Sequence, residues 1–237
     1  MHLLSALAHH LGGTLAQQTV RDKTHASTQV EAVLRQRVFP GRVVPMDALL
    51  TQRHGAQAIG EGAGEDVMIV TEHQPQLHAD IALVLTLSPA GDHPPYARTV
   101  DMGHGRIEPR HRTTSEALVG DTDGPGWAQV CEMGRPGITQ KTGAERVAMV
   151  SGVTSLRPER VSPGPWLACV RGPWHMEHKS HWVRDVTFDA DRSQVRCGNS
   201  PHVMAALRHT ALGVLRWAGH TNLAAACRPL AAQPGRA

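Results

Sequence analysis

Residues 42–47 read R-V-V-P-M-D and residues 66–71 read D-V-M-I-V-T, with residues 48–60 between them. Each quoted stretch is a short apolar run bounded by polar residues, which is typical of a buried β-strand. The residues between them have the apolar spacing of a helix. A strand, a helix and a second strand in this order predict two parallel strands joined by a crossover helix. The fold class is therefore predicted to be α/β.

The preceding residues predict a β-hairpin and a helix. Two short apolar runs, at residues 3–8 and 14–20, flank a Gly-Gly pair that is typical of a tight turn between antiparallel strands, although their Leu and Ala residues are also compatible with helix. A helix is expected next, over residues 27–37, and its apolar face would carry Val30, Val33 and Leu34. These elements extend the alternation of strands and helices over the first 71 residues.

The middle of the chain predicts a change of architecture. Residues 76–87 predict a helix, whereas residues 88–126 are rich in Gly, Pro, His and Asp and predict a loop with one strand near 105–112. Two further strands are expected at residues 129–133 and 146–156. The middle third is therefore predicted to be a β-rich insertion.

The last third returns to a helical pattern. Ser200-Pro201 is a typical helix start, and Gly219 is a typical helix end. Residues from about 233 onward are expected to be disordered. One helical stripe is formed by Met204, Leu207, Ala211 and Leu215.

The composition is that of a water-soluble globular protein, because 41% of the 237 residues are hydrophobic and 19% are charged. No apolar run approaches the roughly 18 residues of a membrane span, and the first residues lack the basic start of a secretory signal. The four cysteines are far apart and form no C-x-x-C pair, which favours reduced thiols over a disulfide or zinc framework. A cytoplasmic protein with no membrane partner is expected.

Positive charge is concentrated at the C-terminal end. Residues 171–237 hold nine basic and four acidic residues, whereas residues 1–100 hold seven and nine. This distribution favours a polyanionic partner, although a solvated basic face would give the same pattern.

Asp47 directly follows the first of the two predicted parallel strands. Carboxylates at the carboxyl ends of such strands commonly face ligand sites in open α/β sheets. The alternative is that Asp47 caps the helix expected after it, because Asp is a favoured N-cap residue.

Residues 171–188 read R-G-P-W-H-M-E-H-K-S-H-W-V-R-D-V-T-F. On a helix, Glu177 and His181 would share one side. Glu177 is expected either to be functional or to pair with Arg171 or Arg184. A zinc site made by the histidines is a further alternative, but their spacing turns steadily around a helix and matches no H-E-x-x-H motif.

Residues 104–110 read H-G-R-I-E-P-R, in which charge alternates with a period of two. On a strand, Arg106, Glu108 and Arg110 would share one face. This pattern is expected either of a surface that contacts phosphates or of a charged ladder between strands.

Several of these stretches resemble, in their order and spacing, the H-repeat-associated group of bacterial insertion-sequence transposases. This group is a branch of the DDE superfamily, which has a ribonuclease H-like catalytic core. The resemblance runs almost end to end. It is carried by H-L-L-S-A at residues 2–6, V-V-P-M-D-A-L-L-T-Q at 43–52, H-Q-P at 73–75, H-G-R-I-E-P-R at 104–110, G-V-T-S-L at 152–156, the block from Trp174 to Trp182, and G-N-S-P at 198–201.

The resemblance implies an activity and assigns residues to it. Asp47 matches the second aspartate of the D-D-E set, and Glu177 matches its glutamate. In this superfamily three carboxylates hold two Mg²⁺ or Mn²⁺ ions, which promote DNA cleavage and strand transfer by phosphoryl transfer. The implied partners are double-stranded DNA, both as element ends with inverted repeats and as target, and further copies of the chain. Further DNA contacts are expected at Arg106, Arg110, Arg171, His181, Trp182, Arg184 and Arg192.

The first aspartate of the set has no match. In the family it lies in an Asp-Gly-Lys segment shortly before H-L-L-S-A, which here begins at His2. The resemblance therefore implies a ribonuclease H-like mixed sheet that lacks its first strand, in an N-terminally truncated and inactive transposase. The alternatives are a non-catalytic remnant that binds DNA or oligomerises, and a complete enzyme whose start lies upstream.

The same resemblance implies a division of the chain into parts. Residues 1–87 are expected to form the first part of the ribonuclease H-like core, and residues 88–165 the β-rich insertion before the glutamate-bearing helix. Residues 166–232 are expected to form the C-terminal helical part of the core, and residues 233–237 a disordered tail.

Overall fold

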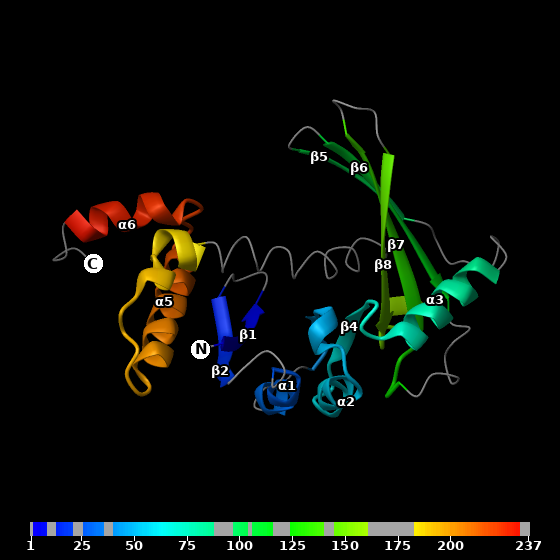
Figure 1. The fold of residues 1–237 in the computed structure, drawn as a ribbon, viewed down its shortest axis with the longest axis horizontal. Helices are drawn as coiled ribbons and strands as arrows, with labels where there is room; N and C mark the ends of the chain where they lie inside the picture. The colour runs from blue at the N-terminus through cyan, green and yellow to red at the C-terminus, as the bar shows by residue number, and fades with distance from the viewer. Residues whose placement is uncertain are drawn as a thin grey trace. The chain divides into compact units, whose positions relative to one another are not determined.

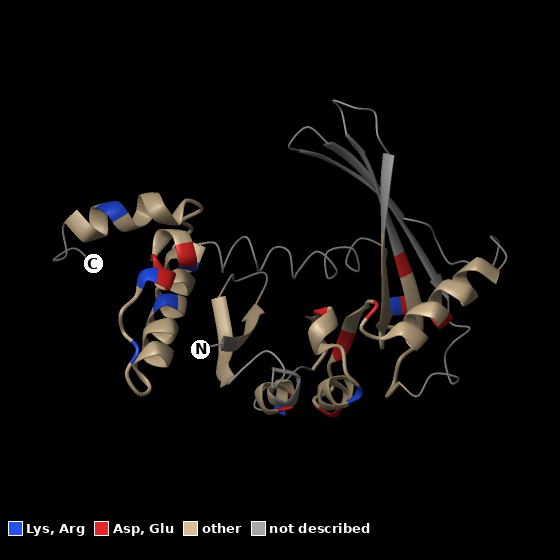
Figure 2. Ribbon diagram, in the orientation of Figure 1, with Lys and Arg blue, Asp and Glu red and all other residues tan. Residues whose placement is uncertain are grey.

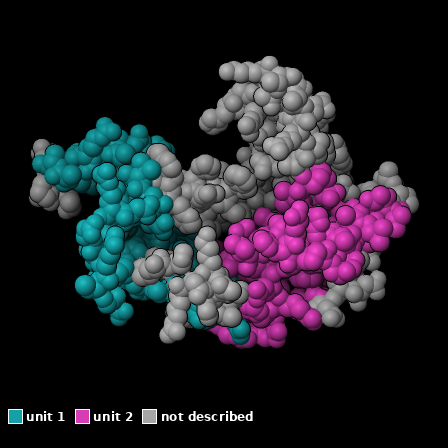
Figure 3. All heavy atoms as spheres, in the orientation of Figure 1, with its two compact units in different colours: residues 1–33, 172–237 teal, residues 34–171 magenta. Residues whose placement is uncertain are grey.

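The protein has two compact units, one formed by residues 34–171 and the other by residues 1–33 together with 172–237 (Figures 1 and 3). Each unit contains strands and helices, so the predicted α/β class is confirmed. The domain boundaries expected from the sequence stay a prediction. The structure is a computed structural model, and it describes residues 2–8, 13–20, 26–35, 40–87, 97–103, 106–115, 124–139, 145–160 and 183–232.

The larger unit is built on a six-stranded sheet. β3 and β4 are parallel, as the sequence predicts, with Val43 opposite Glu65 and Met46 opposite Met68. All other neighbouring strands are antiparallel, so β4 joins the parallel pair to an antiparallel ribbon. In spatial order the strands are β3 (Val43–Met46), β4 (Glu65–Val70), β8 (Glu145–Thr154), β7 (Gln129–Thr139), β6 (Arg106–Ser115) and β5 (Ala97–Gly103).

Two helices pack on this sheet. The helix α2 (Arg53–Glu61) connects β3 to β4 and packs on β4, and α3 (Pro75–Leu87) packs on β6, β7 and β8. The helix predicted over residues 48–60 is two pieces, the 3₁₀ helix η2 (Ala48–Leu50) and α2, because Thr51 and Gln52 have extended backbone. The short turn after Asp47 is therefore separate from the crossover helix.

The core of this unit lies around β4. Ile59 of α2, Met68 of β4 and Ile81 of α3 are all fully buried, and each such side chain stabilises the fold by about 1.5–3 kcal/mol. Gly152 lies where β8 approaches β4, and a Cβ added there would stand 2.8 Å from the Met68 carbonyl oxygen. Only glycine allows this close approach of the two strands.

The middle of the chain contains more strand than its sequence predicts. Residues 88–126 were expected to hold one strand, but the structure has two, β5 and β6. Both contain charged residues and neither shows the apolar pattern of a buried strand; β5 is the edge strand of the sheet, and β6 lies next to it. Because β8 pairs with β4, the β-rich segment continues the sheet of β3 and β4 and does not form a sheet of its own.

The smaller unit combines a hairpin with helices. The antiparallel strands β1 (His2–Ala8) and β2 (Gly13–Val20) form the predicted hairpin, and α5 (Ser200–Trp217) packs on β2. The Gln17 side chain on β2 lies 2.7 Å from His209 Nδ1 and donates a hydrogen bond to the His202 carbonyl. The final helix, α6 (Leu223–Ala232), shares a small apolar core with α5 and with a π-helical turn, η5 (Val183–Thr187).

The sequence predicts the boundaries of α5 correctly but not its buried face. The helix α5 begins at Ser200-Pro201 and ends before Gly219, which has a φ of +86°, as predicted. In α1 (Ala26–Arg35), the predicted apolar face is buried. In α5, by contrast, Leu207 of the predicted stripe is 58% exposed, and the buried residues are Ala205, His209 and Leu212. The tail expected at 233–237 lies outside the described residues.

Candidate functional site

Asp47 lies at the carboxyl end of β3, beside the parallel strand β4. Its side chain is exposed, and Oδ1 accepts a hydrogen bond of 2.8 Å from the Ala48 N–H. This bond caps η2, so the capping role considered for Asp47 is confirmed. Within the described part of the chain, the other carboxylate oxygen has no hydrogen-bond partner. The cap therefore leaves one exposed oxygen at the sheet edge where α/β proteins bind ligands.

The turn that carries Asp47 is tied to the end of β4. The Thr51 hydroxyl lies 2.7 Å from the Ile69 carbonyl oxygen and 3.1 Å from that of Asp47. Gln74, which follows β4, donates a hydrogen bond of 2.5 Å from Nε2 to the Thr51 carbonyl. Reasoning from the sequence gave Thr51 and Gln74 no role, although both stand in stretches that carry the family resemblance.

Asp47 fits one position in a metal site but does not form a site by itself. Mg²⁺ and Mn²⁺ prefer oxygen ligands, and the exposed carboxylate offers one. In the part of the chain that the structure describes, no three or more His, Cys, Asp or Glu residues gather as a metal site would require. Glu177 lies outside the described residues, as do Arg171, His181 and Trp182. The pairing of Asp47 with Glu177 at one ion therefore stays a prediction.

Arg106 and Arg110 lie on β6, as their alternating pattern predicts. Arg106 stands opposite Gly103 of β5, and Arg110 stands opposite Thr99. The two arginines are thus four register positions apart on a strand that has a neighbouring strand on each side. Their proposed contact with DNA stays a prediction.

Arg184 and Arg192 have different surroundings. Arg184 Nε donates a 2.9 Å hydrogen bond to Asp185, and both side chains are partly buried. Arg192 is 87% exposed and lies 3.7 Å from Asp189, a distance at which a surface ion pair contributes little. Arg192 is therefore the more available of the two for an external phosphate. Residues 183–232 together hold six arginines and three aspartates (Figure 2).

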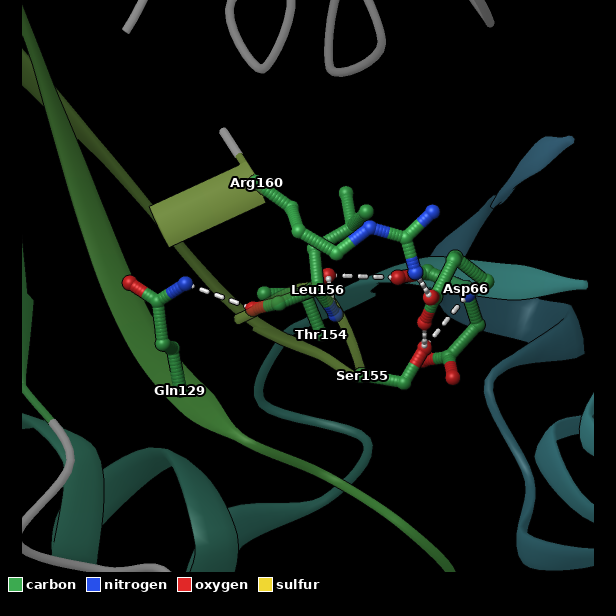
Figure 4. Close-up of polar contacts among 7 residues, drawn as sticks. Asp66, Gln129, Thr154, Ser155, Leu156 and Arg160 are labelled. Carbon is green, nitrogen blue, oxygen red and sulfur yellow. Dashed lines mark hydrogen bonds and ion pairs between the residues drawn. The ribbon is translucent and has the colours of Figure 1, made fainter. Parts of the chain in front are cut away.

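A second polar cluster lies at the opposite end of β4, around Asp66 (Figure 4). The Asp66 side chain is 1% exposed, and its Oδ2 atom is buried with no hydrogen-bond partner among the described residues. Burial raises the pKa of Asp66 to about 6, and hydrogen bonding by Ser155 opposes part of that rise. The Asp66 carbonyl accepts a hydrogen bond of 2.5 Å from the Thr154 hydroxyl of β8.

The rest of this cluster links β4 to the segment after β8. The Ser155 hydroxyl accepts a hydrogen bond from the Asp66 N–H and donates one of 2.9 Å to Glu65. Arg160 Nη1 lies 2.6 Å from the other oxygen of Glu65 (Figure 4). These contacts stabilise the junction of the parallel and antiparallel parts of the sheet, and they leave Asp66 with no opening to solvent. Sequence reasoning placed Asp66 only as the start of a strand.

The chain is similar over most of its length to bacterial proteins named as transposases, which confirms the resemblance seen in its motifs. The chain is 23% identical over 221 residues to "Putative transposase YncI" of Escherichia coli O157:H7. It is 22% identical over 223 residues to "H repeat-associated putative transposase YhhI" of Escherichia coli strain K12.

The coverage of these alignments is uneven. Both include 91% of this chain, whereas the chain spans only 56% and 58% of the length of the two relatives. Over 128 residues the chain is 30% identical to an uncharacterized protein from Xanthobacter autotrophicus. This alignment covers 54% of this chain and 43% of that protein. No family model matches the chain. None of the described helices has the length and apolar character needed to cross a membrane.

Proposed function

We propose that the chain forms part of the catalytic core of an insertion-sequence transposase of the DDE type, with a ribonuclease H-like fold. The observation that carries this proposal is the position of Asp47, an exposed carboxylate at the carboxyl end of β3 beside the parallel strand β4. Similarity over 91% of the chain to two relatives named as transposases supports the class of protein. Among the described strands, β3 is an edge strand of its sheet, so one of its edges is open to pairing with a further strand.

In this proposal Asp47 and Glu177 hold divalent metal, Mg²⁺ or Mn²⁺. Bound metal would supply Lewis-acid stabilisation to phosphoryl transfer at a DNA phosphate. Asp47 contributes one exposed oxygen, while the bond from Ala48 N–H to its other oxygen restrains the side chain. DNA would be contacted by Arg106, Arg110, Arg171, His181, Trp182, Arg184 and Arg192. Of these, the side chain of Arg192 is 87% exposed and that of Arg184 is 23% exposed.

Of the three carboxylates of the DDE set, only the second aspartate and the glutamate have a match in residues 1–237. Two carboxylates hold a metal pair poorly. We therefore expect a polypeptide of these residues alone to bind double-stranded DNA and to cleave it orders of magnitude more slowly than an enzyme with all three. A cytoplasmic location and self-association are parts of the same proposal.

Iron-directed cleavage of the polypeptide tests the metal site without requiring DNA cleavage. Fe²⁺ takes the place of Mg²⁺, ascorbate and hydrogen peroxide generate radicals at the bound ion, and mass spectrometry maps the backbone cuts. We expect cuts close to both Asp47 and Glu177. These residues are far apart in the sequence, so cuts near both would indicate that they bind the same ion. We expect both sets of cuts to disappear in Asp47→Asn.

Asp80→Asn is the matched control, because Asp80 is a carboxylate of the same unit that accepts one local hydrogen bond, from Gln76. Its cleavage pattern should equal that of the unmodified chain. Cuts near Asp47 that persist in Asp47→Asn would overturn the assignment of Asp47. Cuts near Asp47 without any near Glu177 would overturn the shared site.

The excess of arginine over acid in residues 183–232 favours a second candidate, a module that binds DNA without cutting it. Such binding depends steeply on salt, because each neutralised phosphate releases counterions. Fluorescence anisotropy with a labelled duplex at several salt concentrations measures this dependence. Salt-dependent binding combined with a cleavage map that Asp47→Asn leaves unchanged would favour this candidate over the transposase core.

A further inference from the structure

The turn after β3 is held against the end of β4 by the buried hydroxyl of Thr51. Thr51 is 1% exposed, and its Oγ1 atom lies between two carbonyl oxygens, that of Ile69 at 2.7 Å and that of Asp47 at 3.1 Å. The single hydroxyl proton can be shared between both acceptors. The Thr51 side chain therefore holds the backbone of Asp47 against the end of β4.

A side chain from beyond β4 makes a second attachment to the same turn. Gln74 Nε2 donates a hydrogen bond to the Thr51 carbonyl, and the Gln74 backbone N–H bonds to the Thr71 carbonyl at 2.8 Å. The other end of the Gln74 amide, Oε1, is buried without a hydrogen-bond partner among the described residues. A buried unpaired acceptor is unfavourable, and an apolar residue at this position would avoid it. The presence of an amide at this position is therefore best explained by the hydrogen bond that Gln74 donates to the Thr51 carbonyl.

We propose that Thr51 and Gln74 are positioning residues for Asp47, which hold its carboxylate in place for a divalent cation. This inference rests on the proposed function, because it assigns a metal to Asp47. The two bonds restrain the turn on the side away from solvent, while the Ala48 N–H restrains the carboxylate itself. A ligand held in this way loses less conformational freedom when a cation binds.

The test separates positioning from simple stability with three variants. Thr51→Val keeps the shape of the side chain and removes the hydroxyl, and Thr51→Ser restores the hydroxyl. Thr154→Val is the matched control, because Thr154 is equally buried and its hydroxyl donates a similar bond to the Asp66 carbonyl at the other end of β4. For each variant we would measure the denaturant midpoint and the Kd for Mn²⁺, the latter from paramagnetic broadening of the Ala48 amide signal.

We expect Thr51→Val to weaken Mn²⁺ binding about 10-fold, which is the usual effect of losing a group that orients a metal ligand. Thr51→Ser should return the Kd to near that of the unmodified chain. Thr154→Val should lower the denaturant midpoint without changing the Kd. Equal Mn²⁺ affinities in Thr51→Val and Thr154→Val would overturn the proposal.

A measurement that needs no metal distinguishes failure of this inference from failure of the proposed function. The Leu50 N–H bonds to the Asp47 carbonyl at 2.8 Å, so its hydrogen exchange reports whether the turn is held. We expect exchange to be about 10-fold faster in Thr51→Val and in Gln74→Leu, and unchanged in Thr154→Val. If exchange is unchanged in Thr51→Val, the restraint itself is refuted. If exchange accelerates but Asp47→Asn does not alter Mn²⁺ binding, the proposed function has failed and the positioning role falls with it.

Discussion

The buried carboxylate of Asp66 makes the stability of the protein depend on pH in an unusual direction. Asp66 has a pKa of 3.8 when it is exposed and about 6 in the folded protein, mainly because burial disfavours the charged form. Between these two values the folded state holds a proton that the unfolded state has released. Stability from this group is therefore greatest below pH 4, falls as the pH rises towards 6, and changes no further above that.

The size of the effect follows from the pKa difference. A rise from 3.8 to about 6 is roughly two pKa units, and each unit corresponds to about 1.4 kcal/mol. The ionised carboxylate therefore costs about 3 kcal/mol of folding free energy at pH 7. This is a large part of the stability of a domain, which is commonly about 5–15 kcal/mol.

Urea unfolding of the unmodified chain and of Asp66→Asn, at a series of pH values from 4 to 7, measures this cost. Asparagine cannot ionise, so the variant lacks the contribution of this group. We expect the difference in unfolding free energy between the two proteins to change by about 2.5 kcal/mol in favour of Asp66→Asn as the pH rises from 4 to 7, because the unfolded carboxyl is already partly ionised at pH 4. Asp80→Asn, which removes a partly exposed carboxylate, controls for the general loss of charge. Curves for the unmodified chain and Asp66→Asn that run parallel would refute the reasoning.

Three further predictions concern single contacts, and each is checked by urea unfolding. Gly152→Ala should lower the unfolding free energy by about 1–3 kcal/mol because its Cβ would meet a carbonyl of β4. Gly60→Ala, in a helix with open space at its Cβ, should raise it by up to about 1 kcal/mol, and equal effects of the two would contradict the packing argument. Asn222→Ala should cost about 1 kcal/mol by removing the acceptor at the start of α6, whereas Asn222→Ser should cost little. Arg160→Ala should cost less than about 1 kcal/mol, because its pair with Glu65 is largely exposed on the arginine side, and a larger loss would show a stronger pair than we infer.

The elements nearest the candidate site could be predicted because their signals are local. The apolar runs at β3 and β4 and the helical spacing between them predict the parallel pair, and hence the place of Asp47 at its end. The Gly-Gly pair likewise predicts the hairpin of β1 and β2. These patterns depend on residues that are close together in the sequence, and the structure agrees with them.

The remaining features depend on contacts between distant residues. The roles of Thr51 and Gln74 follow from bonds to atoms 18 and 23 residues away, so neither residue stands out in the sequence. Asp66 is buried in a cluster whose other members include Thr154 and Ser155, about 90 residues later, which bond to its backbone carbonyl and N–H. The strand β5 carries no apolar alternation because it lies at the sheet edge, where one row of backbone groups has no neighbouring strand among those described.

The hairpin at the start of the chain and the helix it packs on have a consequence for synthesis. Gln17 and His209 are 192 residues apart, and the contact between them can form only after α5 has left the ribosome. At a translation rate of about 5–20 residues per second, roughly 10–40 s pass between the synthesis of Gln17 and that of His209. During that interval the uncovered strands of the hairpin are open to chaperones and to other nascent chains, whereas residues 34–171 can already collapse around β4. All residues of the larger unit are thus made before the last residues of the smaller one, although residues 1–33 of the smaller unit precede them in the sequence.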